Sequence, residues 1–222
     1  MDWVALWLSL RLGILSVLFL LPIGILVGRL LAYREFRGKG LAEAVVMLPL
    51  VLPPTVLGYY LLVAFGAASP LGQAWQSLFG RPLVFSFEGL LIASIIFNLP
   101  FAIQPTQRAF EAIPREVREA ALCCGMTPWR VLQCVELPLA WPGILTAMVL
   151  SFAHTLGEFG IVLMVGGSIP GETRTVAISI YDRVQAFDDA AAGRMSALLL
   201  ALSLVTIALT FAFSRRIGPR SG

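Results

Sequence analysis

Long stretches without a single charged residue limit most strongly what this chain can fold into. Residues 12–28, 44–80, 89–107 and 195–214 contain no Asp, Glu, Lys or Arg. About 20 consecutive apolar residues allow a helix to cross a bilayer. A soluble domain is about a quarter charged, whereas only 13% of these 222 residues are, and 58% are hydrophobic. The chain is therefore expected to be an integral membrane protein.

The length and composition of these runs indicate helices and not strands. Barrel strands are short and alternate in polarity, whereas these runs are long and mostly aliphatic. A further run at residues 141–165 carries only two ionisable residues, His154 and Glu158. The sequence predicts an all-α integral membrane protein with five transmembrane helices in one domain, residues 12–215. The expected spans are residues 12–32, 44–66, 87–108, 141–165 and 195–214.

Two of these spans carry residues that shape helix packing. Gly24 and Gly28 form a small-xxx-small pair, which favours close helix contact. Pro49, Pro53 and Pro54 interrupt the second span, so the helix must bend or restart there. Broken backbone at membrane depth is tolerated where it lines a cavity or is buried in protein. This segment is a candidate wall of a transport pathway, and a proline-kinked packing helix fits equally well.

The distribution of basic residues predicts the orientation. Eleven of the 16 Lys and Arg residues fall on one side of a five-span chain. The positive-inside rule places that side in the cytoplasm. Residues 1–11 are then an external N-terminus, and residues 216–222 are a cytoplasmic tail. The net charge of +3 is too small to indicate a nucleic-acid partner.

Residues 111–138 are a charged island between the third and fourth spans, on the cytoplasmic side. Pro114 suits a helix start, and Gly125 suits the left-handed residue after a helix end. Thr127 suits an N-cap, with Pro128 at the first position of the next helix. The segment is expected to form two short helices joined by a glycine turn outside the lipid. It either docks a separate protein or caps the two flanking spans.

The spacing within this island resembles the EAA loop of binding-protein-dependent ABC importer permeases. That pattern is EAA, three residues, G, nine residues, I, one residue and LP; here Val135 replaces the isoleucine. Three further segments resemble molybdate importer permeases: LPLVLPP at residues 48–54, LGEFG at 156–160 and IPGETRT at 169–175. Sulfate permeases are similar around residues 156–160. Tungstate is nearly isosteric with molybdate, so the resemblance leaves a tungstate or sulfate permease as an alternative.

The resemblance implies a type I ABC importer permease fold in the cell inner membrane. It implies a homodimer, two ATP-binding cassette subunits at the cytoplasmic face and an external oxyanion-binding protein. The sequence has no G-x-x-x-x-G-K-[ST] phosphate loop. The chain is therefore expected to be a transport subunit, not an enzyme, and to bind no cofactor, while ATP and Mg are used by the partner ATPase. The expected contacts to that ATPase are Glu119, Ala120, Ala121, Gly125, Met126, Trp129, Leu137 and Pro138.

Ionisable groups inside a membrane usually face a bundle interior or a wet cavity. His154 and Glu158 are four residues apart, so on one continuous helix they share a face. They either bond to each other and to helix ends, or help to line a route or gate. A metal or protease site is disfavoured, because the chain has one histidine and no H-E-x-x-H motif. The candidate route or gate residues are Thr55, Asn98, Ser151, Thr155, Gly157, Glu158 and Gly160.

Arg174 lies in the expected external loop, where it either attracts an oxyanion, meets the binding protein or is solvated in a Pro-Gly turn. The cysteines, Cys123, Cys124 and Cys134, are interpreted as reduced cytoplasmic thiols. An ATP-independent secondary transporter remains the alternative of a different class. Such proteins often show internal repeats and several intramembrane charges, which this sequence lacks.

Overall fold

The computed structural model describes the backbone of residues 2–217, with the side chains of residue 207 and residues 209–217 left out. All regular secondary structure in this part of the chain is helical, which confirms the all-α prediction. The expected tail at residues 216–222 lies mostly outside the described residues.

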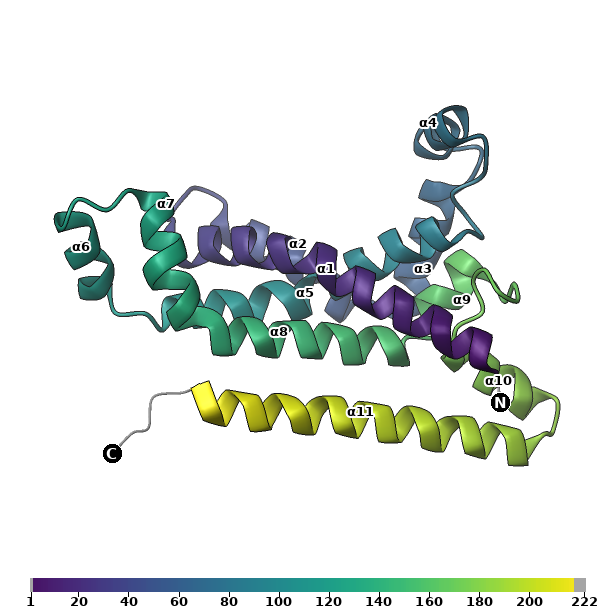
Figure 1. Cartoon of the computed structure of the whole chain (residues 1–222). Coiled ribbons are helices and arrows are strands. Elements are labelled where there is room, and N and C mark those ends of the chain that lie inside the picture. The colour runs from purple at the N-terminus through teal and green to yellow at the C-terminus, as the bar shows by residue number, and fades with distance from the viewer. Residues whose placement is uncertain (1, 218–222) are drawn as a thin grey trace.

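Four long helices form the body of the molecule (Figure 1): α1 (Trp3–Tyr33), α5 (Phe87–Glu111), α8 (Leu137–Gly157) and α11 (Asp189–Ile217). Helices α1, α5 and α8 pack together, whereas α11 lies beside them and packs on α8 and on α10 (Val176–Gln185). The N-terminus lies at one end of the bundle, and the C-terminal end of α11 lies at the other. Among the described residues, four helices are long and apolar enough to cross a membrane, and the number is five if a bent pair of helices is counted as one span.

That bent pair is the second span. Helix α2 (Lys39–Val51) ends before Pro53, and α3 (Pro54–Phe65) restarts at an angle of 106°. Pro54 begins α3 because a proline lacks the N–H that a first helical residue leaves unbonded. Pro49 lies inside α2 without ending it. The predicted restart is confirmed. The same charge-free run also contains a short helix, α4 (Pro70–Phe79).

The expected fourth span at residues 141–165 is wrong as a single helix. Helix α8 ends at Gly157, Glu158 is extended with ψ of 127°, and α9 (Gly160–Gly166) follows. Hydropathy does not reveal such a break, because the run is apolar on both sides of Glu158. His154 and Glu158 therefore do not share the face of one helix.

The expected external N-terminus at residues 1–11 is also mostly helical. Helix α1 begins at Trp3 because the Asp2 carboxylate accepts a hydrogen bond from the N–H of Ala5. Arg11 does not end the helix: its guanidinium lies over the ring of Phe87, 4.3 Å from the ring centre. The charge of Arg11, just before the expected start of the first span at residue 12, is therefore accommodated on the surface of α1.

Close packing of α1 on α5 confirms the small-xxx-small prediction. A Cβ at Gly24 would lie 2.9 Å from the carbonyl oxygen of Ala102, and one at Gly28 would lie 3.0 Å from the nitrogen of Gln107. Only glycine permits this approach of the two backbones. The two helices therefore form a closely packed part of the bundle.

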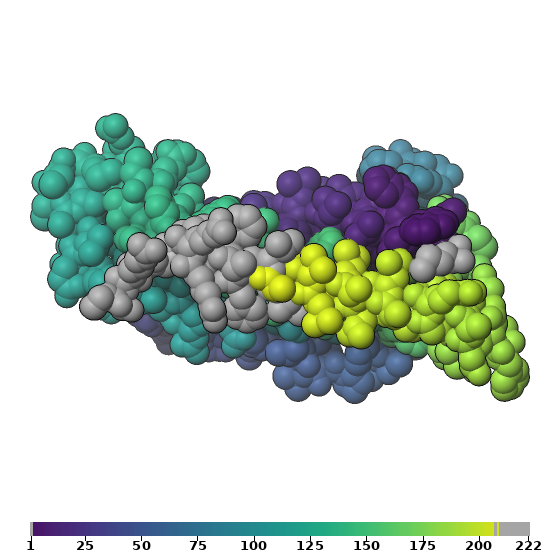
Figure 2. All heavy atoms as spheres, turned by 60° about the horizontal axis from the view of Figure 1, so that its bottom comes forward, coloured from purple at the N-terminus to yellow at the C-terminus, as the bar shows by residue number. Residues whose placement is uncertain are grey.

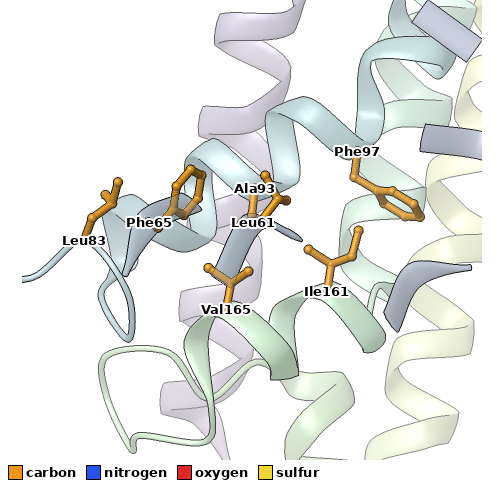
Figure 3. Close-up of a cluster of buried hydrophobic side chains, with 7 residues drawn as sticks. All are labelled: Leu61, Phe65, Leu83, Ala93, Phe97, Ile161 and Val165. Atoms are coloured by element: carbon orange, nitrogen blue, oxygen red, sulfur yellow. The ribbon is translucent and has the colours of Figure 1, made fainter. Parts of the chain in front are cut away.

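A second packing centre joins the short helices α3 and α9 to α5. Figure 3 shows Leu61 and Phe65 of α3 meeting Val165 and Ile161 of α9 beneath Ala93 of α5. A Cβ at Gly58 would lie 2.9 Å from the Cβ of Met164, so α3 and α9 are in direct contact. The two interrupted spans thus pack against each other on the end of α5 that is nearer the N-terminus of the chain.

Candidate functional site

The charged island folds as a helix, a glycine turn and a second helix. Helix α6 (Arg115–Cys123) is followed by Gly125, whose φ is +80°, and by α7 (Pro128–Val131). Left-handed backbone is the usual end of a helix at a glycine. The Thr127 hydroxyl accepts from the N–H of Arg130, so Thr127 caps α7 as predicted. Pro114 is the N-cap of α6 and not its first residue.

This helix pair protrudes as a lobe from one end of the molecule (Figure 2). Glu119, Ala120 and Gly125 are exposed, and Trp129 is 62% exposed. Ala121 is the exception, because it is buried. The set of predicted ATPase contacts therefore divides: Ala121 packs inward, Met126 and Leu137 are half-buried, and Pro138 is exposed in the first turn of α8.

A π-helical turn, η1 (Leu132–Glu136), connects α7 to α8 without a gap. Such turns are rare and frequently occur at functional sites. Glu136 closes this turn and is completely buried. Arg29 of α1 donates to Glu136 from Nε to Oε2 at 2.5 Å and from Nη2 to Oε1 at 3.3 Å. Arg118 of α6 donates from Nε to Oε1 at 2.8 Å.

Sequence reasoning missed this cluster. The sequence assigns no role to Arg29, which lies within the expected first span, or to Glu136, which lies within the charged island. A signal was present: Glu136 falls among apolar residues that lead into a membrane helix, where a charge needs a partner. The partner could not be found from the sequence, because it lies on a different helix.

The predicted route residues Asn98, Ser151 and Thr155 lie inside this single chain. Asn98 is completely buried; its Nδ2 donates to the Ser94 carbonyl at 2.8 Å and to the Thr155 hydroxyl at 3.2 Å. The Ser16 hydroxyl donates to that of Ser94 at 3.0 Å. These bonds link α1, α5 and α8, so the cluster holds the bundle together here. Of the other candidates, Thr55 and Gly157 are exposed.

Glu158 caps the broken helix. Its Oε1 accepts from the N–H of Ile161 at 3.0 Å, and Glu158 is 8% exposed. A Cβ at Gly160 would lie 2.9 Å from the Cβ of Pro54, so the break in the fourth span meets the break in the second. His154 bonds to Asn98 instead, with Nδ1 3.2 Å from Oδ1. A structural role for Glu158 thus has a concrete basis, and a role in gating stays a prediction.

Arg174 is bonded within its own loop. Its Nε donates to the Ser168 hydroxyl at 2.9 Å, and it lies 3.4 Å from Oδ2 of Asp182 in α10. Arg174 therefore ties the loop after α9 to α10. An oxyanion or a binding protein would meet this side chain already paired with an acid.

All three cysteines, Cys123, Cys124 and Cys134, are free and exposed on or beside the helix pair. Within the part of the chain that the structure describes, no group of three His, Cys, Asp or Glu residues could hold a metal ion.

A bundle of membrane-spanning helices with an exposed helix–turn–helix at one end has the construction of a transporter's membrane subunit. The chain belongs to the family described as binding-protein-dependent transport system inner membrane component, whose model matches residues 21–220. It is therefore an ABC importer permease, the membrane subunit of a system whose ATPase is a separate subunit.

Curated relatives cover most or all of the chain. The molybdenum transport system permease protein ModB of Azotobacter vinelandii is 50% identical over 191 residues, 86% of this chain and 84% of that protein. ModB of Escherichia coli is 36% identical over 222 residues, 100% of this chain and 97% of that protein. The sulfate transport system permease protein CysT of E. coli is 31% identical, covering 89% of this chain and 71% of that protein.

Solved structures share the fold at low sequence identity. A bacterial ABC transporter that imports alginate matches with a TM-score of 0.79 at 18% identity, covering 96% of this chain and 79% of that chain. An inward-facing structure of the methionine ABC transporter MetNI matches with a TM-score of 0.74 at 19% identity, covering 96% of this chain and 94% of that chain.

Proposed function

We propose that this chain is the permease of an ATP-driven molybdate importer. The choice of molybdate as substrate rests on sequence similarity along the chain. Relatives named for molybdenum transport reach 50% identity, and those named for sulfate transport reach 32%. The IPGETRT segment at residues 169–175 points the same way. Tungstate is expected to be carried as well, because it nearly matches molybdate in size and charge.

In this proposal two copies of the chain form a homodimer around a central route. Two ATP-binding cassette subunits dock on the two copies of the α6–α7 pair, and an external binding protein delivers the oxyanion at the opposite face. ATP and Mg are bound by those partners. The N-terminus is outside and the C-terminus is in the cytoplasm, in agreement with the positive-inside rule.

The geometry of the chain suggests how the docked element moves the spans. Helices α7, η1 and α8 share one continuous backbone, so a displacement of the docked pair is carried directly into α8. A helix transmits such a shift because its packed contacts have few alternative arrangements. ATP binding would draw the docked pairs together and open the spans outward, and hydrolysis would reset them.

The substrate is tested by competition. The complex of permease and co-purified ATPase is reconstituted in liposomes with its binding protein, and uptake of labelled molybdate is measured. We expect excess tungstate to suppress uptake and the same excess of sulfate to leave it nearly unchanged. Equal competition by sulfate would assign the chain to general oxyanion or sulfate transport.

A further inference from the structure

Helix α6 is attached to the rest of the molecule by few side chains. Of its residues, only Ala121 is buried, and only Arg118 is half-buried; the others are exposed. A cavity of about 590 Å³ lies beside this helix, lined by Leu30, Arg34 and Trp129 among others. Close packing therefore does not join α6 to α1, and the link must come from specific polar contacts.

Arg118 provides that link. Its guanidinium bonds to the buried Glu136 and lies over the ring of Tyr33 in α1, 3.6 Å from the ring centre. The Tyr33 hydroxyl donates to the carbonyl oxygen of Phe110 at 2.9 Å, near the end of α5. Helix α6 is thus connected through one arginine to α1 and, through Tyr33, to α5.

Glu136 is shared by two cations from two helices. Arg29 binds it from α1 and Arg118 binds it from α6, with side-chain exposures of 29% and 25%. A buried carboxylate that loses all its partners is strongly destabilising. Here the removal of either arginine leaves the other in place. One arginine is enough to pair the buried carboxylate of Glu136. The presence of two, one from each helix, connects α1 to α6.

We propose that Arg29, Glu136 and Arg118 form a tie that moves α1 together with the docked helix α6. This rests on the proposed function, in which an ATPase moves α6. The backbone itself joins α6 to α5 through residues 112–114 and to α8 through α7 and η1, whereas α1 has no such link to α6. The tie adds α1, which packs on α5 through the glycine contacts at Gly24 and Gly28. Arg29 and Arg118 are positioning residues, and the tie adds α1 to the helices that follow the motion of α6.

The decisive variant is Arg29→Gln, because Arg29 lies on α1, away from the docking helix pair. It keeps the Glu136–Arg118 pair and leaves the docking surface unchanged. We expect the complex with its ATPase to assemble and hydrolyse ATP, while molybdate uptake per ATP falls at least about five-fold, the lower end of typical coupling effects. Arg29→Lys, which keeps the charge and one donor, should give an intermediate ratio.

The matched control is Arg108→Gln. It removes one cation from an exposed Arg–Glu pair at the end of α5, where the Arg108 side chain is 75% exposed. Its uptake per ATP should equal that of the unmodified complex. A wild-type ratio in Arg29→Gln would overturn the tie. Failure of both Arg29 variants to assemble would also overturn it, by assigning the cluster to folding.

A distance measurement separates this inference from the proposed substrate. In a complex whose three native cysteines are replaced by serine, spin labels are placed through Leu26→Cys on α1 and Glu116→Cys on α6. We expect the label separation to be the same with and without ATP while Arg29 is present, and to change with ATP in Arg29→Gln. The same separation in both backgrounds would refute the tie, whatever the complex transports. Absence of molybdate uptake by the unmodified complex would refute only the proposed function.

Discussion

Gly125 turns the chain between α6 and α7 with φ of +80°, and its Cβ position is open, with no atom within 4 Å. A residue with a side chain at such a φ costs about 1–2 kcal/mol, but here it would meet no steric obstacle. We expect Gly125→Val to distort the turn locally, so that less ATPase co-purifies with a normally folded bundle. Gly40→Val is the control, because Gly40 is also open but has no positive φ. Equal ATPase recovery from both variants would contradict a role for this turn in docking.

Glu158 supplies the only side-chain acceptor for the start of α9 that the structure describes. Glu158→Ala should lower the free energy of unfolding by about 1 kcal/mol, as the loss of a helix cap does. Glu158→Gln keeps an acceptor oxygen and should remain close to the unmodified protein. Thermal unfolding in detergent measures both. A smaller loss in the alanine variant than in the glutamine variant would show that the cap does not stabilise the broken span.

At the scale of helices, the contact of α1 with α5 depends on small residues. Gly24→Ala would place a Cβ 2.9 Å from the Ala102 carbonyl oxygen and force the two helices apart. Overpacking of this kind costs roughly 1–3 kcal/mol. Gly193→Ala in α11 has open space and should be neutral or stabilising, because alanine favours helix by about 1 kcal/mol over glycine. Comparison of the two unfolding temperatures tests this, and equal values would contradict the close contact.

The spans were predictable because segments that lie in the hydrocarbon core of a bilayer lack charged residues. Pro53 and Pro54 marked the restart of α3. The break at Glu158 was not predictable from hydropathy, since apolar residues continue on both sides of it. The cap at Asp2 and the stacking of Arg11 on Phe87 extended α1 beyond the expected boundary.

The candidate site was predicted in part. Spacing alone located the helix pair, because turns and caps depend on neighbouring residues. The tie at Glu136 depends on contacts between residues far apart in the chain, with a sequence separation of 107 from Arg29, so local patterns could not find it.

At the scale of the whole molecule, the native cysteines report the orientation. Cys123, Cys124 and Cys134 are all exposed and lie on or beside the helix pair that is proposed to face the cytoplasm. A membrane-impermeant maleimide should leave the chain unlabelled in intact spheroplasts and label it after permeabilisation. Labelling of intact spheroplasts would reverse the proposed orientation. An added cysteine at residue 171, in the loop that is proposed to be external, provides the opposite control.

In the proposed function, the bundle is a gate that a separate ATPase drives through α6 and α7. The most direct measurement compares uptake of labelled molybdate by two sets of proteoliposomes, with the binding protein present in both. One holds this chain alone and the other holds the complete complex. We expect uptake only by the complete complex and only with ATP at the ATPase face. Full uptake by this chain alone, without ATP, would contradict it and would make the protein a secondary transporter.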